Sequence, residues 1–407
     1  MNLLPVLQAL RFNDRSTAAL AAIPRYAWPP LLHAADTEGL TLPLGLRCRG
    51  SLPAMVEARI AHNLENNAAR HERLSACYAE VAAALQARGI PFVLLKGLSK
   101  TRYYVDDLRY RPQYDIDIYC PETFLASARE TIDGLGYEAV RVTPHSGSDH
   151  LPRMIRKTGW KWREDYFDPD MPVAIELHFQ FWNEASEGFS AGDLNPFWNR
   201  RVVRDVAALQ LPAMGEVDAL TYSALHLVRH LLHGALQFQH IYEMAHFLES
   251  SAADHRFWSE WEESGLVSCR VVEGIAFRLA AEWFHCSLHP AASRAVATLP
   301  NPVQIWFQLF GTSPTLTAAH PGKNELLLHL CLVPGSRDRR RIAMRRLFPI
   351  RRGRVVRDAG ASRAGGARMK LQGVFYEAAF MLRRAAFHTR SLAAMAWSGF
   401  RWWRACS

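Results

Sequence analysis

Three short motifs carry the residues of this sequence that could do chemistry. Residues 94–97 read LLKG, residues 115–117 read DID, and residues 176–178 read ELH. Together they offer three carboxylates behind a glycine turn. Such a layout is typical of sites that transfer a phosphoryl or nucleotidyl group with the help of two divalent metal ions.

The acidic residues fall on two predicted strands. Side chains alternate between the faces of a strand, so Asp115 and Asp117 are expected on one face. Glu176 and His178 share the polar face of the later segment VAIELHFQF. Adjacent carboxylates repel unless a cation neutralises them, and Mg²⁺ prefers carboxylates together with phosphate oxygens and water. We therefore expect the three acids to hold two Mg²⁺ ions, with Asp117 as the bridge.

A glycine turn precedes these strands. The apolar segment PFVLL predicts a strand that ends at Lys96 and Gly97, and residues 99–107 have helical character. Backbone N–H groups at such a junction suit phosphate. Gly97 is therefore expected to let the backbone approach a triphosphate. Lys96 is either a cationic clamp for phosphate or a strand-end lysine paired with an acid.

The order of these motifs resembles the polymerase-β-type nucleotidyltransferase superfamily. More narrowly, LLKG, the Arg-Pro pair at residue 111, DID, the Gly-Tyr pair at residue 136 and IELH resemble an uncharacterised bacterial nucleotidyltransferase family with the signature LKG…R…DID…ELH. The resemblance covers roughly residues 75–250. It implies an α/β (α+β) fold with a polymerase-β-type core of mixed sheet and helices, an NTP substrate, Mg²⁺, and the three acids as catalytic residues and metal ligands.

The resemblance also bears on single residues. Arg111 would bind phosphate oxygens with its two-pronged guanidinium, although a salt bridge within the loop is an alternative. His178 would orient a neighbouring group or accept a proton, although a hydrogen-bonded structural histidine is an alternative. Glu243 stands where the family more often has an aspartate, so its role is open.

A predicted helix, ALHLVRHLLHG, carries a further group of candidates. Its spacing places His226, His230 and His233 at i, i+4 and i+7, on one face. That face would suit zinc on spacing alone. No acid or cysteine with convincing spacing completes the set, however, and His226 and His230 resemble the paired histidines of the family's helical lobe. A cleft-lining role is therefore favoured.

Length and hydrophobic pattern predict four regions in this chain of 407 residues. We expect an N-terminal helical region at 1–90, a nucleotidyltransferase core at 91–205, a helical lobe at 206–335 and a basic C-terminal region at 336–407. A helical lobe beside such a core commonly forms the other wall of a substrate cleft.

Several elements of the core are predicted individually. We expect a long helix over 53–88, a second helix after residue 121, a strand over 137–142, and a hairpin of strands 160–167 and 172–181.

Charge is distributed unevenly along the chain. The net charge of the whole chain is +9. Residues 337–407 hold 18 Lys or Arg and 3 Asp or Glu, a balance of +15. The first 336 residues therefore hold 30 Lys or Arg and 36 Asp or Glu, a balance of −6. Residues 350–370 read as a linker, and residues 371–404 as a helix that mixes aromatic residues with arginine. This helix could lie on an anionic membrane surface, contact nucleic acid, or dock on its own protein. No RNA-binding signature is present, so nucleic acid is not expected.

Composition restricts the location and the class of protein. With 49% hydrophobic residues the chain can build ordinary cores. It opens on no signal-peptide pattern, and no apolar run approaches the roughly 18 residues of a membrane span. The seven cysteines have no C-x-x-C spacing. We expect a cytoplasmic protein, peripheral at most to the inner face of a membrane.

These observations predict an Mg²⁺-dependent transfer of a nucleoside monophosphate from an NTP to an unidentified acceptor, which could be a small molecule, a peptide or a protein. The alternative is a catalytically silent member of the same fold that binds a nucleotide or a partner protein as an accessory factor, with or without a membrane.

Overall fold

A mixed β-sheet lies at the centre of one half of the molecule. The computed structural model describes residues 3–100, 103–140, 149–206, 208–312, 323–347 and 367–406. Its sheet has the order β3-β4-β5-β2-β1-β7-β6. The strands are β1 (Val93–Leu94), β2 (Asp115–Tyr119), β3 (Glu138–Ala139), β4 (Met154–Ile155), β5 (Ala174–His178), β6 (Val202–Val206) and β7 (Leu209–Ala213). This combination of a mixed sheet with helices confirms the expected fold class.

Two helices cover one face of the sheet. They are α5 (Ala54–Ala87) and α6 (Glu122–Gly134), and both confirm predicted helices. The apolar residues of β2 and β5 enter the core that these helices form: Ile116, Ile118, Ile175 and Leu177 are all buried there. Because strand side chains alternate, the acidic residues of β2 and β5 are left on the opposite face.

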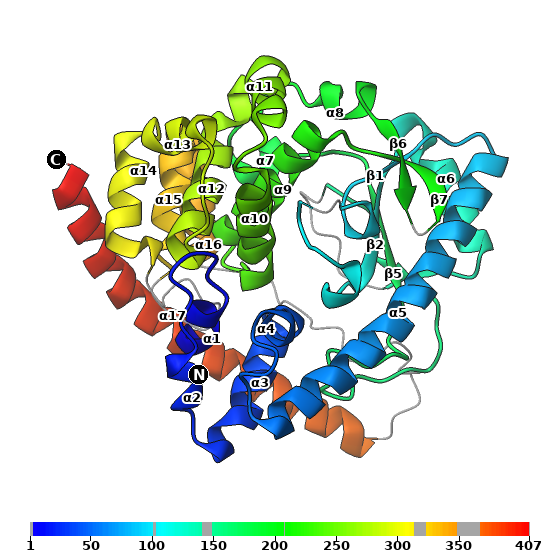
Figure 1. Cartoon of the computed structure of the whole chain (residues 1–407), viewed down its shortest axis with the longest axis horizontal. Helices are drawn as coiled ribbons and strands as arrows, with labels where there is room; N and C mark the ends of the chain where they lie inside the picture. Colours follow the sequence, from blue (N-terminus) through cyan, green and yellow to red (C-terminus); the bar gives the residue numbers. More distant parts are fainter. Residues whose placement is uncertain are drawn as a thin grey trace.

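Helices fill the rest of the molecule (Figure 1). Short helices form the N-terminal region: α1 (Leu4–Ala9), α2 (Ala18–Ala21), α3 (Trp28–Thr37) and α4 (Thr41–Arg47). The helical lobe contains α9 (Glu216–Leu232), α10 (Phe238–Ser251), α11 (His255–Ser264), α12 (Arg270–Phe284), α13 (Pro290–Ala297), α14 (Asn301–Trp306) and α15 (Glu325–Leu332). Two short helices, α7 (Glu184–Glu187) and α8 (Asn195–Asn199), link β5 to β6. The lobe faces the side of the sheet that carries the acidic residues, as expected of a lobe that forms the second wall of a substrate cleft.

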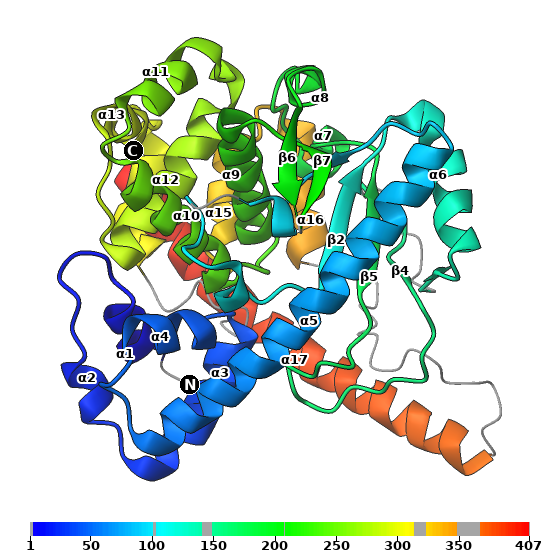
Figure 2. The same cartoon turned by 45° about the vertical axis from the view of Figure 1, so that its right-hand side comes forward.

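The C-terminal region holds two further helices, α16 (Ser336–Leu347) and α17 (Ala367–Cys406). Helix α17 confirms the predicted C-terminal helix and runs diagonally across the molecule, from the lower right to the C-terminus at the upper left of Figure 2. Most of the predicted linker lies outside the described residues. Among the described helices, none is both long enough and apolar enough to cross a membrane.

Three expectations about local structure are wrong. No strand extends over 160–167, which instead forms a loop held on α5: the buried Arg70 donates to the carbonyl oxygens of Tyr166 and Asp168 at 3.0 and 2.6 Å. After β1, the described residues form the 3₁₀ turns η2 (Gly97–Ser99) and η3 (Leu108–Tyr110) and no longer helix.

The third concerns the end of the core. Strand β7 pairs with β1, so the sheet continues to Ala213, beyond the boundary expected at residue 205. The predicted strand over 137–142 is reduced to β3, and residues 141 and 142 lie outside the described residues.

Candidate active site

The parallel pairing of β2 with β5 brings the expected acids together. Asp117 is the register partner of Glu176, and Asp115 is that of Ala174. Oxygen or nitrogen atoms of Asp117, Glu176 and His178 all lie within 4.8 Å of one another. Two motifs far apart in the sequence thus form one cluster, on the face of the sheet that looks toward the helical lobe.

Asp117 lies at the centre of this cluster. Its side chain is 1% exposed, and its Oδ1 lies 3.2 Å from both Lys96 Nζ and His178 Nε2. Its Oδ2 is buried and has no hydrogen-bond partner in the part of the chain that the structure describes. A buried carboxylate oxygen without a partner is costly, so the site has a position suited to a further cation.

His178 connects Asp117 to a second carboxylate. Its Nδ1 lies 3.6 Å from Asp149 Oδ2, and Asp149 in turn forms a buried ion pair with Arg229 of α9. Sequence reasoning missed both Asp149 and Arg229. Asp149 follows no recognisable motif, but Arg229 lies one helical turn from His226 and could have been found from that spacing.

Arg153 is another residue that the sequence did not single out. Its Nε and Nη2 donate to Glu176 Oε1 at 2.8 and 2.6 Å, and Nη2 lies 3.9 Å from Asp115 Oδ2. Arg153 therefore holds a positive charge over two of the three acids. It belongs to the irregular segment before β4, where no periodicity marks it.

Gly97 makes the close turn that follows β1. Its φ of +78° is in the left-handed region, and a Cβ at this position would lie 2.2 Å from Gln113 Nε2. Gln113 donates to the carbonyl oxygen of Asp115 at 2.6 Å and to the hydroxyl of Tyr78 at 3.1 Å. The glycine thus allows Gln113 to fix the start of β2, and Lys96, beside it, is paired with Asp117.

Arg111 does not point its guanidinium at the acidic cluster. Its Nε donates to Glu243 Oε1 of α10 at 2.9 Å, which is a salt bridge to the helical lobe and not the expected one within the loop. Lys100 pairs with the other oxygen of Glu243, and Gln239 donates to Oε1 at 2.7 Å. Glu243, whose role was open, therefore ties the loops of the core to the helical lobe.

A cavity of about 1100 Å³ opens between the sheet, the N-terminal helices and the helical lobe. Six of the seven candidate residues line it, namely Lys96, Gly97, Arg111, Asp115, Glu176 and His178. Asp117 lies behind them. The volume is large enough for a substrate of nucleotide size, with acids on one wall and both basic residues and histidines on the others.

A family model described as an uncharacterised nucleotidyltransferase matches residues 25–285. The chain belongs to this family. The match confirms the resemblance drawn from the motifs and covers the sheet together with the helices that build the cavity, from α3 to α12. No curated protein and no solved structure matches the chain.

Charges in this nucleotidyltransferase are arranged in alternation. Burial raises the pKa of Asp115 to about 6, and the neighbouring charge of Asp117 acts in the same direction. Burial would also raise the pKa of Asp117, but Lys96 and His178 lower it below its ordinary value. Burial alone would lower the pKa of His178, but hydrogen bonds to Asp117 and Asp149 and their charges raise it to about 9. At neutral pH, His178 is therefore an imidazolium between two carboxylates.

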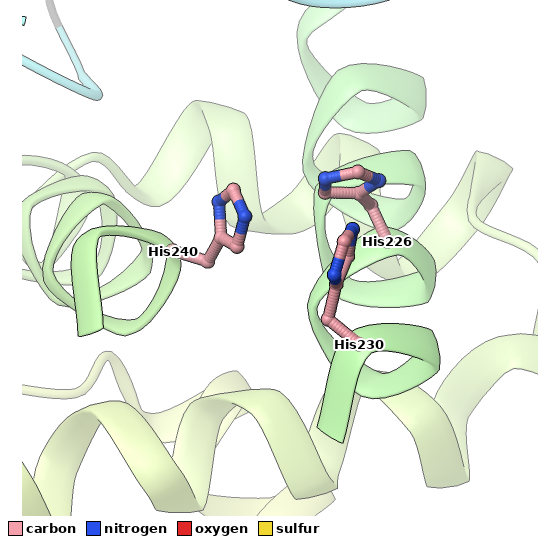
Figure 3. Close-up of side chains that lie close together, drawn as sticks. All are labelled: His226, His230 and His240. Carbon is pink, nitrogen blue, oxygen red and sulfur yellow. The ribbon is translucent and has the colours of Figure 1, made fainter. Parts of the chain in front are cut away.

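The histidines of the nucleotidyltransferase's lobe divide into two groups. His226 and His230 face the cavity as expected, and His240 of α10 joins them (Figure 3). His233 also lines the cavity but stands apart from these three, because its Nε2 lies 2.9 Å from Glu187 Oε2 of α7. The cleft-lining role expected of these histidines is thus consistent with the structure, but the close cluster pairs His226 and His230 with His240, which comes from a neighbouring helix that sequence spacing cannot reveal.

Proposed function

We propose that this nucleotidyltransferase transfers a nucleoside monophosphate from an NTP to an acceptor hydroxyl in an Mg²⁺-dependent reaction at Asp115, Asp117 and Glu176. The observation that carries the proposal is the register of β2 with β5, which sets Asp117 beside Glu176, and Glu176 lines a cavity large enough for a nucleotide.

The donor set fits magnesium. All three candidate ligands are carboxylates, which hard divalent cations prefer, and the buried Oδ2 of Asp117 has no partner among the described residues. When bound, two Mg²⁺ ions would lower the pKa of the acceptor hydroxyl and shield the charge of the leaving pyrophosphate.

The protein's own side chains supply the remaining functions. Lys96, at 3.2 Å from Asp117, brings a positive charge next to the acids for the phosphates of the NTP. Glu176 is held by Arg153 and faces the cavity, where it would orient the acceptor hydroxyl and take its proton. The acceptor oxygen then forms a bond to the α-phosphorus while the bond to the β-phosphate oxygen breaks and pyrophosphate leaves.

Label transfer tests this proposal. The purified protein is incubated with Mg²⁺, each α-labelled NTP in turn, and cell extract as the source of acceptor. We expect labelled product from the wild type and a decrease of at least roughly a hundredfold for Asp115→Ala and Asp117→Asn. Asp133→Asn, an exposed acid on α6, serves as the matched control and should transfer normally. No transfer with any NTP would instead favour the accessory-factor alternative.

We also propose that α17 lies on an anionic membrane surface, which would be the cytoplasmic one. Trp397, Phe400 and Trp403 are 64%, 50% and 62% exposed, and their spacing of three residues places them on one face. The exposed Arg401 and Arg404 flank this aromatic face. Aromatic rings beside arginine suit the boundary between anionic headgroups and acyl chains.

The opposite side of the helix is already occupied. Trp402 donates to the carbonyl oxygen of Pro302 on α14 at 3.3 Å, and Ser391 is fully buried. Docking on its own protein therefore accounts for one face of α17, and the exposed aromatic rings lie on another.

Vesicle co-sedimentation tests the membrane proposal. The full chain should pellet with vesicles that contain phosphatidylglycerol and much less with pure phosphatidylcholine, and added salt should weaken the binding. Replacing Trp397, Phe400 and Trp403 by Ser should reduce partitioning about tenfold or more. Tyr26→Ser, at an 83% exposed position far from α17 in sequence, is the control. Equal pelleting of the wild type and the triple variant would exclude this role.

A further inference from the structure

Three histidines of the helical lobe meet at the wall of the cavity. His226 and His230 lie one turn apart on α9, and His240 faces them from α10 (Figure 3). Ring centroids are 4.4 Å apart for His226 and His230, 4.9 Å for His226 and His240, and 5.2 Å for His230 and His240. One ring nitrogen of each lies within 4.8 Å of those of the other two.

From this geometry we propose that His226, His230 and His240 form a binding site for a divalent transition-metal ion of the zinc type, separate from the carboxylate site on the sheet. Such an ion binds imidazole nitrogen at about 2.0–2.1 Å in a tetrahedral arrangement. Nitrogens bound in this way lie about 3.4 Å apart, so the three rings would have to turn toward one another when an ion binds. Magnesium would not compete, because it prefers oxygen ligands.

Helix geometry makes the arrangement possible. Residues four apart on α9 share one face, so His226 and His230 project together. Helix α10 packs against α9 and supplies the third ligand from across the groove. A site built from two packed helices is more rigid than one on a loop, which reduces the entropy lost when an ion orders the three rings.

Contacts outside the three rings support ligation. The backbone N–H of Ala235 donates to the carbonyl oxygen of His230 at 2.9 Å, which fixes the end of α9 that carries this ring. Arg229 approaches His226 Nδ1 only at 3.4 Å and forms its ion pair with Asp149. Arg229 would therefore compete only weakly with a metal ion for the Nδ1 of His226.

Cations near the cluster would oppose a bound metal, but each is neutralised by an acid. Lys96 lies 3.2 Å from Asp117 Oδ1, and Lys100 pairs with Glu243. Arg229 pairs with Asp149 in the same way. The field at the three histidines is therefore much weaker than three free positive charges would produce.

Three protein ligands leave one tetrahedral position for a ligand from solution. All three histidines line the cavity, so this position faces the space in which a substrate would lie. The ion would take water there, or an anionic oxygen such as that of a phosphate or carboxylate on the acceptor. Metal sites with an open position are typical of substrate binding or catalysis, whereas structural zinc is closed by four protein ligands.

Metal titration tests this inference. The full chain, dialysed against a chelator, is titrated with Zn²⁺ in competition with a chromogenic chelator. We expect one tight ion per chain, and a loss of affinity greater than about 100-fold for His226→Ala and for His240→Ala. His233→Ala is the matched control, because His233 is on the same chain segment but pairs with Glu187; its affinity should equal that of the wild type.

Cobalt provides a readout that does not depend on the variants. Co²⁺ bound by the wild type should give the intense visible absorption of a low-coordinate site without thiolate charge-transfer bands, since the ligands are nitrogens. Weak octahedral absorption, thiolate bands from the free cysteines, or unchanged zinc affinity in folded His226→Ala and His240→Ala would each overturn the proposal. Asp117→Asn should lose label transfer and retain zinc, so the two sites can fail separately.

Discussion

At the scale of single residues, the site depends on close approaches that only particular side chains allow. Gly97 is the clearest case, because its left-handed backbone and its contact with Gln113 both exclude a β-carbon. Gln113 in turn holds the carbonyl oxygen of Asp115 at 2.6 Å. A change at Gly97 is thus transmitted to the first acid of the pair without touching it.

Gly97→Ala should therefore lower both stability and transfer. The left-handed backbone costs about 1–2 kcal/mol for alanine, and crowding against Gln113 and Tyr78 adds about 1–3 kcal/mol. Thermal denaturation should show a decrease in Tm of several degrees. Gly136→Ala separates the two effects, since Gly136 has a φ of +84° but nothing within 4 Å of its added Cβ. If both variants lose the same stability, the contact with Gln113 is unimportant.

At the scale of elements, the periodicity of the sequence correctly predicted which residues of a strand are buried and which face the cavity. The alternation of β2 and β5 correctly assigned apolar residues to the core under α5 and α6, and acids to the other face. The register that sets Asp117 beside Glu176 was only implied by the family resemblance, because strand pairing joins segments that are distant in sequence.

Elements fixed by single long-range contacts could not be predicted. Residues 160–167 alternate like a strand, but Arg70, from a helix far away in the sequence, holds their loop instead. In the same way, Arg153 reaches Glu176 and Asp149 reaches His178 only through the fold, and His240 joins His226 and His230 because α10 packs against α9. No local sequence pattern predicts such long-range contacts.

At the scale of the whole molecule, a buried ion network joins the two walls of the cavity. Glu243 of the helical lobe holds both Lys100 and Arg111 of the core, and the three side chains are only 5%, 11% and 9% exposed. Burial would raise the pKa of Glu243, but Arg111 and Lys100 lower it below its ordinary value. Separating the two walls would break both ion pairs, so the network stabilises their contact.

This network predicts how stability responds to acid. Because the folded-state pKa of Glu243 is depressed, its ionisation stabilises the fold fully above the unfolded-state pKa of about 4.5, and this contribution is lost as pH falls below that value. Glu243→Gln leaves two buried cations uncompensated and should cost about 3–5 kcal/mol at pH 7. Denaturant unfolding of chelator-treated protein measures the free energy of unfolding of both proteins, and the difference between wild type and variant should become smaller below about pH 4.5. The control is Glu130→Gln, at an exposed pair with Arg88, which should cost at most about 1 kcal/mol both at pH 7 and below pH 4.5. If the difference in unfolding free energy between wild type and Glu243→Gln stayed constant with pH, Glu243 would not be the group that makes stability depend on acid.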